Sequence, residues 1–249
     1  KYKSILDENS KNRVDLTDIP TITIDPDNAR DFDDAVFCKE IGDGGWTLIV
    51  AIADVSHYVR QGSDLDKEAR ARGNSVYLPD LVVPMLPEAI SNDLCSLRPH
   101  EDRAAMVAEI FIDNEGKKSS HSIQRALIRS HARLTYDQVQ AVFDGVMDEA
   151  DCDVPHGCLH ALFGAWRALD QDRQDREPLA LNLKERRVVM DETGKAIAIS
   201  QQSQTESQRL IEDFSSLPSE MSLLIWLRWT MLHLGGFSFR LAHSLACLN

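Results

Sequence analysis

The sequence has little positive charge for its size, and this shortage limits what the chain can bind by itself. Its 249 residues carry 27 lysines and arginines against 40 aspartates and glutamates, which gives a formal net charge of −13. A free-standing domain that binds nucleic acid is more often basic, because lysine and arginine neutralise phosphates. Composition alone therefore argues against RNA, unless the contacts are confined to a channel or other domains supply the basic surface.

Cysteine is also scarce, and the few that occur are scattered. The five are Cys38, Cys95, Cys152, Cys158 and Cys247. An odd, dispersed set suits reduced thiols in a cytoplasmic protein better than a disulfide framework. Four possible zinc ligands do lie within nine residues, namely Cys152, His156, Cys158 and His160. Their spacing matches no common zinc pattern, so zinc is not favoured.

The sequence patterns of a signal peptide and of a membrane span are not found either. Residues 1–18 are polar and contain no apolar run like that of a signal peptide. Because the first residue is Lys1 rather than Met, we expect a processed chain or a piece of a longer protein. Residues 221–248 are apolar, but the basic residues Arg228, His233, Arg240 and His243 interrupt them, so we expect no membrane span.

What the sequence does have is an acidic cluster near its start. Residues 25–34 contain five aspartates, of which four are candidate site residues: Asp25, Asp31, Asp33 and Asp34. Like charges this close raise one another's pKa, so they commonly have a cation between them. Oxygen ligands alone favour a hard ion such as Mg²⁺, Mn²⁺ or Ca²⁺. Thr21–Ile24 alternates like a strand and Pro26 ends it, which places Asp25 at a strand end and the other three on the following loop.

Two other interpretations of this cluster remain. Acidic loops are often only solvated surface, because aspartate favours turns. A calcium loop of the EF-hand type needs a glycine at its sixth position and a glutamate at its twelfth, and this segment has neither.

The rest of the chain mixes strands and helices without a regular alternation of the two. We expect strands at Trp46–Ala53 and Met106–Asp113, helices at Ser63–Arg72, Thr135–Gly145 and Leu159–Asp170, and a hairpin of Val188–Met190 with Ala196–Ile199. Arg125, Arg129 and Arg133 recur every fourth residue, as on a solvated helix face or a channel wall. The fold class predicted is α+β, with a mixed-sheet core and surrounding helices.

Several blocks together resemble the catalytic domain of the ribonuclease II / ribonuclease R family of exoribonucleases, and the ribonuclease R branch most. They are Thr23-Ile24-Asp25-Pro26, Ala29-Arg30-Asp31-Phe32-Asp33-Asp34-Ala35, Val50–Val59, Asn74–Pro79, Val83–Pro87, Ser91–Leu97 and Ile128–Tyr136. The similarity runs from about Arg13 to Phe214. It implies an N-terminal part of the catalytic domain over 19–214, with 1–18 as the end of a preceding region or linker.

The resemblance implies hydrolysis of single-stranded RNA from its 3′ end, releasing nucleoside 5′-monophosphates with the help of Mg²⁺, or alternatively Mn²⁺. It makes Asp25, Asp31 and Asp34 the expected metal ligands, with Asp33 as a fourth catalytic aspartate. Tyr77 would pack on the terminal nucleotide, although a core tyrosine is the alternative. Arg98 would meet a phosphate, unless it is an ordinary surface arginine. Cold-shock-like and S1 domains would supply further RNA contacts in a full-length protein, and neither type is evident here.

The family pattern stops at Phe214. Residues 215–249 are a divergent hydrophobic tail, which we interpret as a possible frameshift product, and they contain no counterpart of the family's Ser-Pro-Ile-Arg-Arg-Tyr-like motif. The arginine of that motif stabilises the phosphate, so catalysis by this chain alone is in question. Two alternatives to an active exoribonuclease stay open: a catalytically inactive RNA-binding fragment and a metal-binding structural domain.

Overall fold

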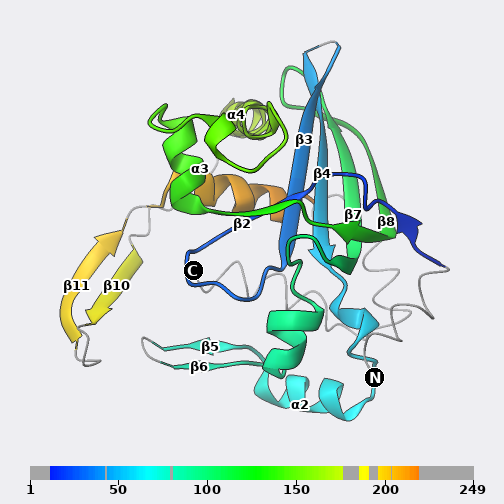
Figure 1. Ribbon diagram of the computed structural model, residues 1–249, viewed down its shortest axis with the longest axis vertical. Helices are drawn as coiled ribbons and strands as arrows, with labels where there is room; N and C mark the ends of the chain where they lie inside the picture. The colour runs from blue at the N-terminus through cyan, green and yellow to red at the C-terminus, as the bar shows by residue number, and fades with distance from the viewer. Residues whose placement is uncertain are drawn as a thin grey trace.

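A mixed β-sheet forms the centre of the computed structural model, which describes residues 12–42, 44–78, 81–175, 185–190, 196–202 and 204–218. Its strands are β1 (Val14–Asp15), β2 (Ile22–Asp25), β3 (Asp34–Ile41), β4 (Gly45–Ala53), β7 (Asp102–Ile112), β8 (Lys118–Arg129) and β9 (Ala132–Thr135). They lie in the order β1-β8-β7-β4-β3-β2-β9 (Figure 1). The pairs β1/β8 and β2/β9 are parallel and the others antiparallel, so the predicted α+β class is confirmed.

Three helices cover one face of this sheet. They are α3 (Tyr136–Phe143), α4 (Cys158–Asp175) and a helix of residues 206–218 (Figure 1, orange). Leu48 and Val50 of β4 point into the same apolar core as Leu162 of α4 and Phe214. Because these side chains are almost completely removed from water, their burial is a main source of the stability of this layer.

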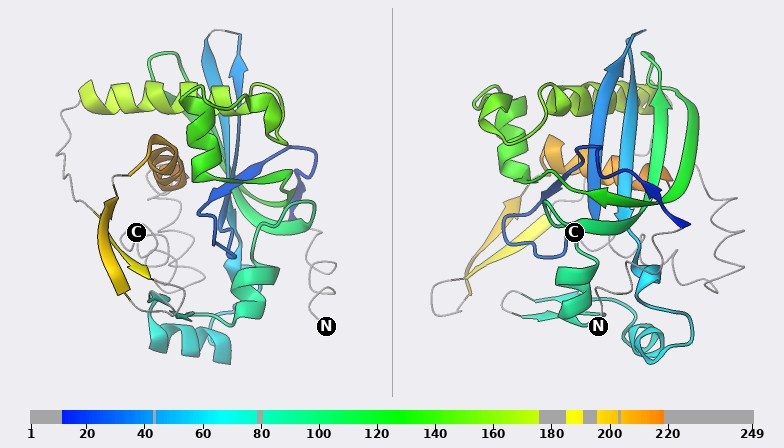
Figure 2. Two further views of the ribbon diagram at one scale, coloured as in Figure 1. Left: turned by 60° about the vertical axis from the view of Figure 1, so that its left-hand side comes forward. Right: turned by 45° about the vertical axis from the view of Figure 1, so that its right-hand side comes forward.

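The opposite face is covered by smaller elements. Ile49 and Ala51, the alternate residues of β4, pack in a second core with Ala69 of α2 (Asp64–Arg72) and Ile90 of the short helix η3 (Ile90–Leu94). Strand β4 is therefore buried on both sides, which explains its nearly continuous apolar sequence. Figure 2 shows α2 at the end of the molecule away from α4, next to the hairpin of β5 (Val76–Tyr77) and β6 (Val82–Val83).

The predicted helix starts are confirmed by their caps. The side chain of Ser63 accepts a hydrogen bond from the backbone N–H of Asp66 at the start of α2, which ends before Gly73. Thr135 and Gln138 form a reciprocal capping box at the start of α3. The helix of residues 206–218 begins in the same way, with Thr205 and Gln208 exchanging side-chain and backbone hydrogen bonds.

The predicted hairpin near residue 190 is also confirmed, as β10 (Glu185–Met190) paired antiparallel with β11 (Ala196–Gln202). The helical interpretation of the arginine repeat is wrong, because Arg125 and Arg129 lie on β8 and Arg133 lies on β9. Strand β8 pairs with β7 over its whole length, and this pairing is what holds the polar segment in a strand.

Three further predictions concern the hydrophobic tail, a membrane span and a zinc site. The helix of residues 206–218 continues four residues past Phe214, and residues 219–249, with most of the predicted tail, lie outside the described part. Within that part, no helix is both long and apolar enough to span a bilayer. Cys152 and Cys158 are buried, while His160 contacts the carboxylate of Glu149, so the described residues do not assemble the zinc set.

Candidate functional site

The acidic residues lie where two neighbouring strands meet the loop that joins them. Strands β2 and β3 pair antiparallel with Ile22 opposite Val36, so the end of β2 at Asp25 lies beside the start of β3 at Asp34. The loop between them carries Asp31 and Asp33, and the carbonyl of Asp33 accepts a hydrogen bond of 2.8 Å from the backbone of Ala53. The sheet therefore brings the ends of the predicted cluster to one edge.

Three of the four carboxyl groups hold protons far more tightly than an aspartate in water. Burial raises the pKa of Asp25 to about 8, with further contributions from the charges of Asp34 and Asp33. Burial, followed by the charges of Asp31 and Asp34, raises the pKa of Asp33 to about 7. The pKa of Asp34 rises to about 6, mainly through burial, although a hydrogen bond from Ser215 opposes the rise. Such raised values are typical of functional carboxyl groups.

Asp25 is the most enclosed of the set. Only 7% of its surface is exposed, and Oδ2 is buried with no hydrogen-bond partner among the described residues. An unpaired buried carboxylate oxygen is costly, because water is removed and nothing replaces it. Either a proton or a cation would relieve that cost.

The helix of residues 206–218 reaches the same site from far along the sequence. Ser215 Oγ donates a hydrogen bond of 2.9 Å to Asp34 Oδ2. Tyr136, the first residue of α3, is also affected by these carboxylates, because burial and then the charges of Asp34, Asp25 and Glu212 raise the pKa of its hydroxyl. Tyr136 was not selected from the sequence. It is placed here because β9 pairs with β2, so that Asp25 lies opposite Thr135, the cap of α3.

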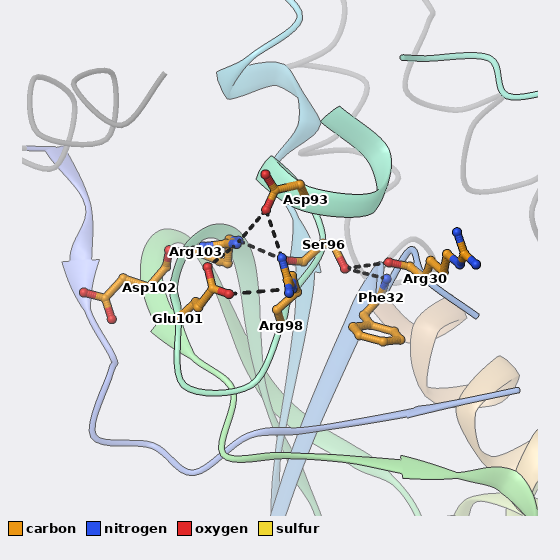
Figure 3. Close-up of polar contacts among 8 residues, drawn as sticks. All are labelled: Arg30, Phe32, Asp93, Ser96, Arg98, Glu101, Asp102 and Arg103. Carbon is orange, nitrogen blue, oxygen red and sulfur yellow. Dashed lines mark hydrogen bonds and ion pairs between the residues drawn. The ribbon is translucent and has the colours of Figure 1, made fainter. Parts of the chain in front are cut away.

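The structure describes the two residues predicted to bind RNA to different extents. Tyr77 lies in β5, where its backbone pairs with Val82, and its side chain lies outside the described part of the structure. Arg98 is half exposed, and its guanidinium faces two carboxylates (Figure 3). It bonds Asp93 at 3.1 Å and lies 3.6 Å from Glu101, so its charge is already partly neutralised by the protein.

The raised pKa values predict how the stability of the metal-free chain depends on pH. A carboxyl group that binds its proton more tightly in the folded state loses stabilisation as the pH rises. The free energy of unfolding should therefore decrease between the ordinary aspartate value of 3.8 and about 8, the pKa of Asp25. Thermal melts in EDTA at about pH 5 and about pH 8 measure this, and the decrease should be smaller for Asp25→Asn. Equal slopes for the two proteins would contradict the assignment.

The donors fit a hard divalent ion in their chemistry but do not form a closed cage. Among the described residues, no three His, Cys, Asp or Glu side chains form a group that could hold a metal ion. The expected ligands Asp25, Asp31 and Asp34 are thus not assembled as one cluster. Calcium takes six to eight oxygens, whereas Mg²⁺ keeps several waters and uses one or two carboxylates together with substrate phosphates. The carboxylate oxygens at this place are donors that hard divalent ions prefer.

Comparisons with known proteins identify a family that covers most of the chain. The model of the RNB domain matches residues 13–221. Ribonuclease R of Vibrio parahaemolyticus is 44% identical over 214 residues, which is 85% of this chain and 25% of that protein. Ribonuclease R of Escherichia coli is 41% identical over the same share of this chain and 26% of its own length.

A solved structure shares the fold. Mycoplasma genitalium RNase R in complex with ribose methylated single-stranded RNA superposes with a TM-score of 0.83 at 34% identity, over 90% of this chain and 35% of that one. The chain spans about a quarter of the length of the curated relatives it matches.

Proposed function

The chain belongs to the RNB-domain family, and from that membership we propose that it is the first part of the catalytic domain of a 3′-5′ exoribonuclease that hydrolyses RNA to nucleoside 5′-monophosphates. The observation that carries the proposal is the buried set of Asp25, Asp33 and Asp34 where β2 and β3 meet their connecting loop, with all three pKa values raised by burial and those of Asp25 and Asp33 raised further by the charge of Asp34. Relatives named ribonuclease R and a related structure with bound single-stranded RNA support RNA as the substrate.

The aspartates would hold one or two Mg²⁺ or Mn²⁺ ions. Bound there, the ions would supply positive charge that activates the attacking water and stabilises the leaving oxygen. Asp25, Asp31 and Asp34 are the proposed ligands, because their carboxylate oxygens are the donors such ions prefer. Asp33 would keep the loop geometry and contribute negative charge, since its backbone is fixed to Ala53.

Other side chains would act on the RNA itself. The Tyr136 hydroxyl, placed among the carboxylates of Asp25, Asp34 and Glu212, can donate a hydrogen bond to a phosphate oxygen or to a metal-bound water. Tyr77 would stack on the terminal base, a contact worth roughly 1–3 kcal/mol for any base. Arg98 would reach a phosphate only by leaving Asp93 and Glu101, so we give it a smaller part.

The direct test is nucleotide release by the purified chain. Incubated with 3′-labelled single-stranded RNA and Mg²⁺, the chain should release labelled mononucleotide, and Asp33→Asn should remove this release while leaving the fold intact by circular dichroism. Asp27→Asn, which changes an exposed aspartate of the same loop, should release nucleotide like the parent chain.

Each alternative function has its own outcome in this assay. Retained RNA binding with no release from the parent chain would favour an inactive RNA-binding fragment, an alternative supported by the absence of an assembled three-ligand metal group among the described residues. Tight Ca²⁺ binding with no effect of RNA would favour a metal-binding structural domain. For the full-length protein we propose cold-shock-like and S1 domains as partners in RNA binding, and the cytoplasm as the compartment.

A further inference from the structure

A buried serine holds the acidic loop on both sides of Asp31. Ser96 Oγ accepts a hydrogen bond of 3.0 Å from the backbone N–H of Phe32 and donates one of 3.2 Å to the carbonyl of Arg30 (Figure 3). The next residue adds a third bond, because the N–H of Leu97 donates to the carbonyl of Phe32 at 2.8 Å. Ser96 has no exposed surface. One hydroxyl thus fixes the backbone on either side of a proposed metal ligand.

Arg103 holds the serine in turn. Its Nε donates a hydrogen bond of 2.9 Å to the carbonyl of Ser96, and the residue is only 7% exposed. The far end of the guanidinium bonds Glu101 at 2.7 Å and lies 3.7 Å from Asp93. These two carboxylates also face Arg98, so two arginines and two acids form one network behind Ser96 (Figure 3). A buried arginine without such partners would be strongly unfavourable.

The loop needs a restraint of this kind because its charges repel one another. Asp31, Asp33 and Asp34 lie within four residues of one another, so their negative charges act on a common region. Without a cation, this repulsion favours opening of the segment around Phe32. The other end of the loop is tied by Arg133, which donates to the carbonyls of residues 26 and 27. The ties at Ser96 and Arg133 hold the loop in one shape against the repulsion of its carboxylates.

We propose that Ser96, supported by Arg103, is a positioning residue that keeps the loop of Asp31, Asp33 and Asp34 in the shape that receives a divalent ion. The inference deepens the proposed function and rests on it for the identity of the ligand. It assigns a role to the block Ser91–Leu97, which lies outside the acidic loop. The network around Arg103 would support the metal site indirectly, by holding Ser96 in place rather than by contacting the ion.

The test compares Ser96→Ala with Ser130→Ala in the whole chain. Ser130 is a matched control, since it is 1% exposed and its hydroxyl bonds two backbone carbonyls, those of Thr21 and Ala132. Mn²⁺ binding is measured from the electron paramagnetic resonance signal of the free ion. The rate of hydrogen exchange at the backbone amide of Phe32 is measured in EDTA. Ser96→Ala should weaken Mn²⁺ binding roughly tenfold or more and speed the exchange, whereas Ser130→Ala should change neither, whatever its melting temperature.

A second variant covers the case in which Ser96→Ala fails to fold. Arg103→Lys keeps the positive charge but loses the fixed fork of donors, so it should give the same two changes in smaller degree. Unchanged Mn²⁺ affinity in folded Ser96→Ala, or an equal loss in Ser130→Ala, would overturn the positioning role while leaving the proposed function standing. If the parent chain binds no Mn²⁺, the proposed function loses its metal site, and the Phe32 exchange alone decides the role of Ser96.

Discussion

Asparagine in place of Asp25 is expected to weaken Mn²⁺ binding by roughly a hundredfold or more and, at the same time, to make the metal-free chain harder to unfold. The two effects have one cause. The carboxyl group is 7% exposed, one of its oxygens has no partner among the described residues, and burial raises its pKa to about 8. The same enclosure that opposes a bare negative charge strengthens its attraction to a cation.

The stability gain should depend on pH in a defined direction. Near pH 8, the folded parent chain carries a partly ionised, buried Asp25, and asparagine removes that charge, so a gain of up to about 5 kcal/mol is expected from a pKa raised to about 8. Near pH 5 the aspartate is protonated in the folded chain but mostly ionised in the unfolded chain, so the gain should fall to roughly 1–2 kcal/mol, and it should vanish only below the ordinary aspartate value of 3.8.

Thermal melts in EDTA and Mn²⁺ titrations of the same preparations check both effects. Asp27→Asn is the matched control. Asp27 is exposed in the same loop, so its substitution also removes one negative charge, but that charge is not a buried one. It should change Mn²⁺ affinity and melting temperature little. An Asp25→Asn chain that binds Mn²⁺ like the parent, or that melts lower in EDTA near pH 8, would remove Asp25 from the metal site.

The second large effect is expected far from the site, at Gly116. This residue lies in the turn between β7 and β8 with a φ of 80°, and a Cβ there would lie 2.1 Å from the carbonyl oxygen of Ala168 in α4. The obstacle is helix backbone, which cannot rotate away as a side chain can. Gly116→Ala should therefore push the turn off α4 and lower the free energy of unfolding by roughly 3 kcal/mol or more.

Gly73→Ala separates this clash from backbone strain. Gly73 has nearly the same φ, 81°, but a Cβ there meets nothing within 4 Å. Its substitution should cost only about 1 kcal/mol, the ordinary penalty for a side chain in this conformation. Urea unfolding of the two variants gives the comparison, and similar losses would mean that the turn does not press on the helix.

The acidic site could be predicted in part from the sequence because its main residues are close together along the chain. Asp25 falls at the strand end that local alternation and Pro26 already indicate, whereas Asp34, expected on the loop, is the first residue of β3. Tyr136 could not be found this way, since its place depends on the parallel pairing of β9 with β2. The role of Ser96 likewise depends on a contact with a loop 64 residues earlier.

The fold shows the same division between local and distant signals. The capping residues Ser63 and Thr135 were found because a cap is defined by neighbours three residues apart. Strand β8 was missed because its first half is polar and exposed, with no alternation to detect. It is a strand because β7 pairs with it, and the local sequence of β8 does not indicate that pairing.

The bond between Ser215 and Asp34 joins residues 181 positions apart. The helix of residues 206–218 supplies this bond, and the bond favours the ionised form of Asp34 against the burial that raises its pKa. A hydroxyl near the end of the described chain therefore helps to keep charged a carboxylate at the start of β3.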